Sequence, residues 1–131
     1  MEKKPFYHFW PGSHALTVGS WSCNSLCPWC QNFHITKSPP DPAGSEYIVP
    51  DRFVELVKRY GCRSTSVSFN EPTLLLEWSL DMFELARKEG FSNTFVTNTY
   101  VTLKALRMLH DAGLDVLCID VKGDAEAVHK Y

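Results

Sequence analysis

The sequence predicts an α/β fold in which about four parallel strands alternate with helices. From Asp51 onward, segments with helical spacing of apolar residues alternate with β-prone segments. A glycine follows each helical segment, at Gly61, Gly90 and Gly113, as is common where helices end. Residues 116–119 are continuously apolar, which is typical of a parallel strand covered on both faces. With right-handed crossovers, such a chain forms either a portion of a (β/α) barrel or an open sheet.

The boundaries of the elements follow from composition and capping residues. We expect strands at residues 15–22, 64–69, 94–97 and 116–119, and helices at residues 51–60, 73–89 and 103–112. Asp51 and Thr102 are suitable N-caps, because their side-chain oxygens can accept from the first free amides of a helix. Residues 37–50 contain four of the eight prolines and are expected to form a loop or lid.

The length of 131 residues indicates one domain, residues 1–131. A complete eight-unit barrel takes about 250 residues, or roughly 30 per unit. The chain therefore holds about four units, and the strand at residues 116–121 should be an open, apolar edge. Because such an edge presents unpaired amides and carbonyls, we expect self-association through it.

Composition excludes several classes of function. The 13 basic and 15 acidic side chains give a formal charge of −2, which argues against nucleic-acid binding and against a polybasic membrane surface. No apolar run approaches the ~18 residues needed to span a bilayer, and the first residues do not form a secretory signal. Five cysteines, an odd count, favour a reducing, cytoplasmic location over a disulfide framework.

Three of the cysteines lie within eight residues, directly after the first expected strand. Cys23, Cys27 and Cys30 have the spacing C-x3-C-x2-C, and three thiolates on one loop can converge on a soft metal centre. They are one ligand short of the usual four around a cubane iron–sulfur cluster, which would leave one iron open. Alternatively, His34 completes a closed Cys3His zinc site, or the three residues are ordinary reduced thiols.

The cysteine loop, with an aromatic residue before its last cysteine, resembles the signature of radical S-adenosylmethionine (SAM) enzymes. Segments that follow the later expected strands extend the resemblance to the pyruvate formate-lyase-activating-enzyme-like branch, in particular to the AmmeMemoRadiSam-system radical SAM proteins. Residues 69–73, 96–100 and 119–123 follow the second, third and fourth expected strands. Residues 2–13, before the first strand, and residues 30–32, at the end of the cysteine loop, also match. The resemblance covers essentially the whole chain. It implies a truncated radical SAM barrel, either a fragment or an unusually short member.

The resemblance also implies a reaction. A [4Fe-4S] cluster held by Cys23, Cys27 and Cys30 would bind SAM at its open iron, and SAM would be reductively cleaved to methionine and a 5′-deoxyadenosyl radical that abstracts hydrogen from a substrate. Glycyl-radical activating enzymes work in this way. The electron donor would be a protein such as flavodoxin or ferredoxin, and the substrate is a small molecule or a protein. The competing hypothesis is a non-enzymatic, zinc-stabilised α/β interaction module that uses His34 as the fourth ligand.

Six further residues are expected to contact SAM, because they match the motifs of the resembling family. They are Trp29, Asn70, Glu71, Asn98, Asp120 and Lys122. Each also has a structural alternative. Trp29 could be an apolar plug, Glu71 a helix N-terminal carboxylate, and either asparagine a turn-capping residue. Asp120 and Lys122 should share one face, because side chains alternate along a strand. Alternatively, they are the solvent-exposed end of that strand.

The sequence departs from the family pattern at two turns. Thr99 stands where the third-strand turn usually has glycine, which takes positive φ freely. Phe69 and Asn70 replace a Gly-Gly pair, so that bulkier groups face the bound nucleoside. Relatives also have an N-terminal cysteine-bearing segment and two further strand–helix units. With SAM contacts from those units missing, we expect this chain to hold a cluster but to bind SAM weakly.

Overall fold

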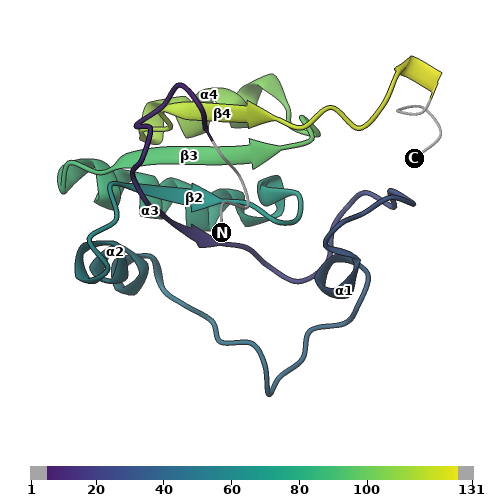
Figure 1. Ribbon diagram of the computed structural model, residues 1–131, viewed down its shortest axis with the longest axis horizontal. Coiled ribbons are helices and arrows are strands. Elements are labelled where there is room, and N and C mark those ends of the chain that lie inside the picture. The colour runs from purple at the N-terminus through teal and green to yellow at the C-terminus, as the bar shows by residue number, and fades with distance from the viewer. Residues whose placement is uncertain (1–5, 127–131) are drawn as a thin grey trace.

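The computed structural model describes residues 6–126, in which four parallel strands form one sheet in the order β1-β2-β3-β4 (Figure 1). The first residues of segment 2–13, which contributed to the family resemblance, lie outside the described residues. The strands are β1 (Ala15–Val18), β2 (Ser64–Val67), β3 (Ser92–Thr97) and β4 (Val116–Ile119). Because neighbouring strands are consecutive in sequence, right-handed crossovers place the longer connecting helices on one face of the sheet. The predicted fold class, a partial parallel (β/α) barrel with an open edge, is confirmed.

Five short or medium helices connect the strands. They are α1 (Phe33–Thr36), α2 (Pro50–Arg59), the 3-10 turn η1 (Pro72–Leu75), α3 (Leu76–Lys88) and α4 (Leu103–Ala112). The boundaries of α4 agree with its sequence signals, because the Thr102 hydroxyl accepts from the Ala105 amide at 3.1 Å and Gly113 is left-handed with φ +113°. Helix α2 begins one residue earlier than expected, with Pro50 in its first turn and Val49 as the N-cap. Asp51 is thus a first-turn carboxylate and the cap assignment was wrong.

Two expected strands are shorter than predicted. β1 ends at Val18 and β2 at Val67. Phe69, expected to be the last residue of the second strand, instead has φ +82°, which is incompatible with a strand. Residues 37–49 contain no strand or helix, as expected of a loop. Helix α1 was not anticipated, since four residues are too few to show a helical period.

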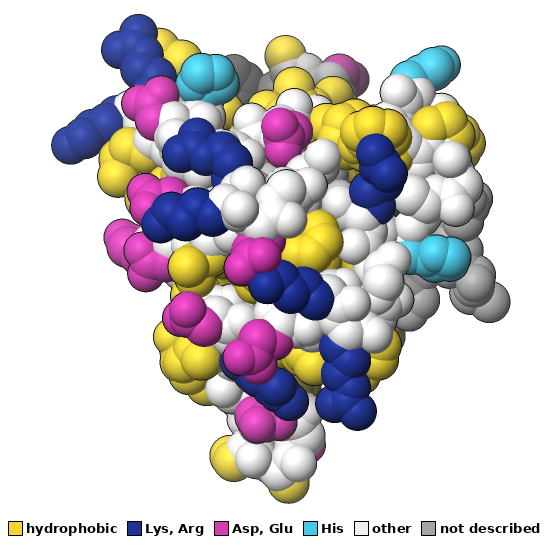
Figure 2. Space-filling view, turned by 90° about the vertical axis from the view of Figure 1, so that its left-hand side faces the viewer, with side chains coloured by type: hydrophobic (Ala, Val, Ile, Leu, Met, Phe, Trp, Pro, Cys, Tyr) yellow, Lys and Arg dark blue, Asp and Glu magenta, His cyan; other side chains and the backbone are white. Residues whose placement is uncertain are grey.

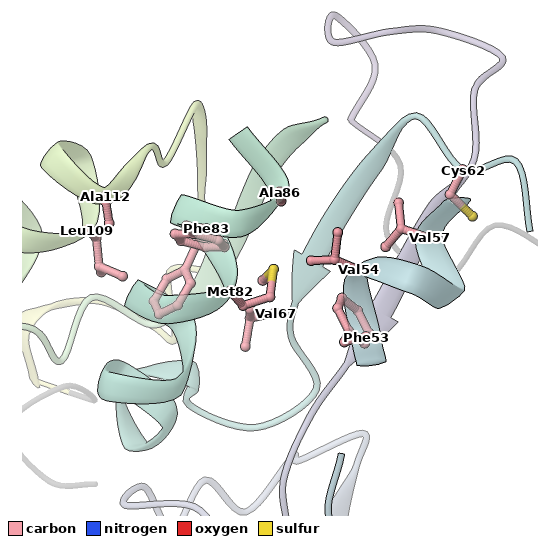
Figure 3. Close-up of a cluster of buried hydrophobic side chains, with 11 residues drawn as sticks. Phe53, Val54, Val57, Cys62, Val67, Met82, Phe83, Ala86, Leu109 and Ala112 are labelled. Atoms are coloured by element: carbon pink, nitrogen blue, oxygen red, sulfur yellow. The ribbon is translucent and has the colours of Figure 1, made fainter. Parts of the chain in front are cut away.

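The hydrophobic core lies between the sheet and helices α2, α3 and α4 (Figure 3). Met82 and Phe83 of α3 are fully buried beside Val67 of β2, and the Phe83 ring meets the Phe95 ring edge-on at 6.2 Å. Burying a side chain of this size contributes about 1.5–3 kcal/mol. This layer fixes the strands firmly, so the loops at their carboxyl ends are held relative to one another.

A buried polar residue joins the same layers. The Asn93 side chain of β3 donates to the carbonyls of Phe83 and Gly113, at 3.1 and 2.9 Å, and accepts from the Thr65 hydroxyl at 2.7 Å. A buried amide with its hydrogen bonds satisfied costs little and fixes the register of its neighbours. Asn93 therefore links β3 by hydrogen bonds to β2, to α3 and to the end of α4.

The amino ends of the strands are covered by the segment that precedes β1. Trp10 donates from its indole nitrogen to the Ser92 hydroxyl at 3.2 Å, and the Arg63 guanidinium carbon lies 3.5 Å from the Trp10 ring centroid. On this side of the molecule, Lys and Arg side chains alternate with Asp and Glu (Figure 2). Among the described helices, none is long and apolar enough to cross a membrane.

Strand β4 is less covered than its apolar sequence suggested. Val116, Leu117 and Cys118 are half-buried and Ile119 is 55% exposed. Within the described residues, β4 is hydrogen-bonded to β3 alone. The expectation of a strand covered on both faces was wrong, and β4 is an edge strand.

Candidate functional site

The carboxyl ends of all four strands surround one pocket with a volume of about 330 Å³. The strands point toward the side of the molecule where α1 lies (Figure 1). The lining residues come from the cysteine loop and α1, the loop after β2, the end of β3, and the segment after β4. They are Cys23, Ser25, Cys27, Trp29, Cys30, Gln31, Asn32, Thr36, Ser68, Phe69, Asn70, Glu71, Val96, Thr97, Asn98, Asp120, Val121 and Lys122. The three cysteines proposed as cluster ligands and the six residues expected to contact SAM are all in this set, whereas His34, the alternative zinc ligand, is not.

The three cysteines of the loop are free thiols that line the pocket. Cys27 is buried, whereas Cys23 and Cys30 are half-buried. The Cys30 sulfur lies 3.1 Å from the Thr36 hydroxyl, and the Lys37 ammonium donates to the Cys27 carbonyl at 2.8 Å. Contacts with Lys37 and Thr36 thus stabilise the loop at its second and third cysteines.

No three His, Cys, Asp or Glu side chains within residues 6–126 lie close enough together to hold a single metal ion. His34 is exposed on α1, packs edge-on against Phe33 at 5.9 Å, and is not among the pocket-lining residues. The fourth ligand of the zinc hypothesis therefore lies away from the pocket that contains the three thiols.

Two cysteines lie outside this site, as their isolation in the sequence suggested. Cys62 is buried after α2, and burial raises the pKa of its thiol. Because only the thiolate is a good nucleophile or ligand, Cys62 is a structural residue at neutral pH. Cys118 is half-buried on β4.

Asn70 joins the loop after β2 to the start of the cysteine loop. Its side-chain oxygen accepts from the Ser20 amide at 3.2 Å, and its side-chain nitrogen donates to the Ser22 carbonyl at 2.9 Å and to the Ser20 hydroxyl. Asn70 is 8% exposed. The amide that was expected to contact SAM is therefore engaged with backbone groups directly before Cys23.

Two further asparagines make similar connections. Asn32 donates from its side chain to the Phe69 carbonyl at 2.6 Å, and Asn98 donates to the Ser25 hydroxyl at 2.8 Å. The Asn98 side-chain oxygen accepts from the Tyr100 amide at 2.9 Å, which makes it a turn-capping residue as well. The cysteine loop is consequently fastened to the loops after β2 and β3 by three side-chain amides.

Glu71 is 2% exposed and lies between the ends of β2 and β3. Its Oε1 accepts from the Thr73 amide at 3.1 Å, the Thr73 hydroxyl at 2.5 Å and the Thr97 hydroxyl at 2.7 Å. Its Oε2 accepts from the Asn98 amide at 2.9 Å. A carboxylate offers about four acceptor positions, two on each oxygen, so Oε1 is crowded and Oε2 retains capacity for one more donor.

Asp120 and Lys122 lie after β4 and line the pocket together. The Lys122 ammonium is 2.7 Å from Asp120 Oδ2, and each side chain is a little over one-third exposed. The expectation that the two share a face agrees with this contact. Trp29 also lines the pocket, half-exposed at 50%, on the cysteine loop.

Three non-glycine residues in or next to the site have left-handed backbone conformations. Ser22, Phe69 and Thr99 have φ of +70°, +82° and +70°. Phe69 and Thr99 stand where the resembling family has glycine, so the glycine-type conformation is retained without the glycine. Such conformations cost about 1–3 kcal/mol each and persist where surrounding structure enforces them.

The loop after β2 also approaches the end of β1 closely. A Cβ added at Gly19 would lie 2.6 Å from the Ser68 carbonyl oxygen and 2.9 Å from the Phe69 ring. Only glycine fits at this approach.

Sequence reasoning missed several residues of the site. Asn32, Ser25, Gln31 and Thr36 all line the pocket, yet none was proposed as a site residue. Asn32 stood in the Cys-Gln-Asn segment that contributed to the family resemblance. Thr36 carried no signal beyond its position six residues after Cys30, because its contact depends on the short helix α1.

Two comparisons with known proteins found similarities to this chain. Residues 21–131 match the family model described as the radical SAM superfamily. The chain is also 35% identical over 130 residues to a protein of Methanocaldococcus jannaschii that is named only as uncharacterized. That alignment covers 99% of this chain but 38% of the relative, so the chain spans about two fifths of the relative's length.

Proposed function

Because the chain belongs to the radical SAM superfamily, we propose that it is an iron–sulfur-dependent enzyme that reductively cleaves SAM. Members of this superfamily generally bind a [4Fe-4S] cluster and SAM. The observation that carries the proposal is that Cys23, Cys27 and Cys30 all line one pocket at the carboxyl ends of the strands. Parallel α/β folds place their chemistry at this end.

The donor set of the pocket fits a cluster of this kind. Three soft thiol ligands lie on one short loop, and Fe–S clusters are held by cysteine thiolates. Three protein ligands around a four-iron cluster leave one iron for an exogenous group. A [4Fe-4S] cluster held by Cys23, Cys27 and Cys30 would supply the one-electron reduction that cleaves the C–S bond of SAM to methionine and a 5′-deoxyadenosyl radical, and this radical would abstract hydrogen from a substrate.

The remaining residues of the pocket would bind and orient SAM. Oε2 of Glu71 is the acceptor we assign to the SAM ammonium, because a charge-assisted hydrogen bond to a buried carboxylate is strong. Trp29 offers an aromatic face for the adenine. The Asp120–Lys122 pair places both signs of charge at the end of β4, where polar groups of the ribose or the methionine moiety can be recognised.

Asn70 and Asn98 contribute to binding indirectly in this proposal. Both residues line the pocket, but their side chains are already hydrogen-bonded to the cysteine loop, at Ser22 and Ser25. Their role is therefore to keep the cluster ligands and the SAM-binding loops in one arrangement, which reduces the ordering cost of binding.

Within the superfamily, we assign the chain to the pyruvate formate-lyase-activating-enzyme-like branch. The motifs at residues 69–73, 96–100 and 119–123 support this assignment, because the structure brings Glu71, Asn98 and Asp120 to the same pocket. Hydrogen abstraction from a protein backbone, as in the activating enzymes, is the substrate hypothesis that follows by analogy. The reducing equivalent would come from a flavodoxin or a ferredoxin.

Anaerobic reconstitution with iron and sulfide tests the proposal. We expect a brown protein with about four iron atoms per chain, and formation of 5′-deoxyadenosine when SAM and a strong reductant are added. The matched control is Cys27→Ala, which should form neither the cluster nor the product. A colourless protein that holds one zinc per chain would contradict the proposal.

A further inference from the structure

Thr36 has a contact that the proposed function does not account for. Its hydroxyl oxygen lies 3.1 Å from the sulfur of Cys30, within hydrogen-bond distance for a pair that includes sulfur. Thr36 is the last residue of α1 and is 6% exposed, and both residues line the pocket. The contact is therefore a partly buried one within the site.

The direction of this hydrogen bond is fixed once Cys30 binds iron. In the free thiol, either atom could be the donor. A cysteine that ligates iron is a thiolate, which has no proton to donate. If this contact is retained as a hydrogen bond, the Thr36 hydroxyl is its donor and the sulfur its acceptor.

The backbone of α1 holds the hydroxyl in place. The Thr36 amide donates to the Asn32 carbonyl at 2.9 Å, and the Asn32 side chain donates to the Phe69 carbonyl at 2.6 Å. The Lys37 amide donates to the Phe33 carbonyl at 3.0 Å, which closes the same turn. The backbone that carries the donor is thus held by its own helix and, through Asn32, by the loop after β2.

We infer that Thr36 is a positioning residue that raises the reduction potential of the cluster by donating a hydrogen bond to the Cys30 thiolate. Reduction adds one negative charge to the cluster and its sulfur ligands, so a donor at the sulfur stabilises the reduced state more than the oxidised state. Hydrogen bonds to cluster sulfurs are among the factors that set Fe–S potentials. This inference rests on the proposed function, since it requires a cluster at Cys30.

The Thr36→Val substitution tests the inference with little change of shape. It replaces the hydroxyl by a methyl group and keeps the β-branched side chain, whereas Thr36→Ser keeps the hydroxyl. The matched control is Thr17→Val on β1, an exposed residue outside the pocket lining. The measurement is the midpoint potential of each reconstituted chain, titrated anaerobically with a low-potential reductant.

We expect a more negative midpoint potential in Thr36→Val, and potentials close to wild type in Thr36→Ser and Thr17→Val. Unchanged iron content with an unchanged potential in Thr36→Val would overturn the inference and leave the proposed function intact. A wild-type chain that holds no four-iron cluster would instead contradict the proposed function.

A spectroscopic measurement covers the case in which Thr36→Val retains too little cluster to titrate. Thr36→Ser and Thr36→Ala are then compared after exchange into deuterated water, with the reduced cluster observed by electron–nuclear double resonance. We expect a strongly coupled exchangeable deuteron in wild type and Thr36→Ser that is missing in Thr36→Ala. The same couplings in all three chains would overturn the inference.

Discussion

The side-chain amide of Asn70 donates a hydrogen bond to the backbone carbonyl of Ser22, 2.9 Å away and 48 positions earlier in the chain. Ser22 precedes the first cysteine of the site and has the left-handed φ of +70°. The same side chain accepts from the Ser20 amide. The backbone conformation that presents Cys23 to the pocket is therefore stabilised from the loop after β2.

Substitution of Asn70 should weaken cluster binding more than it weakens the fold. Asn70→Ala leaves the Ser20 amide and the Ser22 carbonyl without their side-chain partner, at a cost of about 1–3 kcal/mol in the free energy of unfolding. Asn70→Asp can still accept from Ser20 but cannot donate to Ser22, so it should also lose iron. Iron content and thermal unfolding of both variants check this. Full iron retention in Asn70→Asp would show that the hydrogen bond to Ser22 is dispensable.

Each cysteine of the loop should be required for cluster retention. Replacing Cys23, Cys27 or Cys30 with Ala removes one of only three proposed protein ligands, so iron and the associated visible absorbance should be lost after reconstitution. His34→Ala is the matched control and should retain the cluster, because His34 is exposed outside the pocket lining. Loss of iron in His34→Ala would mean that the ligand set has been misassigned.

Glu71→Gln should reduce SAM affinity of the reconstituted protein. The substitution keeps the size of the side chain but removes the charge that we assign to the SAM ammonium. A hydrogen bond to a charged group contributes about 1.5–3 kcal/mol, so the dissociation constant should rise roughly tenfold to a hundredfold. Calorimetry measures this, with Glu77→Gln, an exposed residue of the first turn of α3, as the control.

The alternative role of Glu71 predicts a different result. Its carboxylate accepts from Thr73 at the start of η1 and from Thr97 and Asn98 at the end of β3. If Glu71 only stabilises these turns, Glu71→Gln will lower the unfolding temperature and leave SAM affinity unchanged. That outcome would remove Glu71 from the SAM site.

The order of the elements and the place of the cysteine loop were readable from the sequence. Both depend on local signals, namely helical periodicity, the glycines that end helices, and cysteine spacing. The partners of Asn70 and Asn98 were not readable, because their hydrogen bonds join positions 48 and 73 residues apart. Such contacts depend on how strand ends meet in space, which no local pattern encodes. Thr36 was missed for the same reason.

The turn at Thr99 shows a second limit to what the sequence predicts, namely the backbone conformation of a residue that replaces glycine. The sequence indicated that Thr99 could change the turn, since threonine avoids positive φ. The structure keeps φ at +70°, and the Thr99 amide donates to the Thr97 hydroxyl at 2.9 Å. The surrounding hydrogen bonds therefore decide the conformation, and the residue is strained.

Thr99→Gly should stabilise the fold. A left-handed β-branched residue costs about 1–3 kcal/mol, and glycine removes this cost while adding up to about 1 kcal/mol of chain entropy in the unfolded state. Thr99 is exposed, so little packing is lost, and we expect a net gain of about 1 kcal/mol in denaturant unfolding. Thr102→Gly is the control. It lies at φ −77° and caps α4, so this change should destabilise the protein by a few tenths of a kcal/mol. Equal effects of the two substitutions would contradict the strain argument.

The exposed edge at β4 should cause this chain to self-associate at high concentration. Within the described residues β4 pairs with β3 alone, and Ile119 is 55% exposed at its end. Unpaired amides and carbonyls beside apolar side chains form a template for a strand from another molecule, whereas a lysine on an edge strand opposes such pairing.

Ile119→Lys should therefore shift sedimentation profiles toward the monomer without a large loss of stability. Leu103→Lys, on the exposed side of α4 and 73% exposed in the wild type, should leave association unchanged. A wild-type chain that stays monomeric at high concentration, or an Ile119→Lys chain that associates as strongly as wild type, would show that β4 is not the contact.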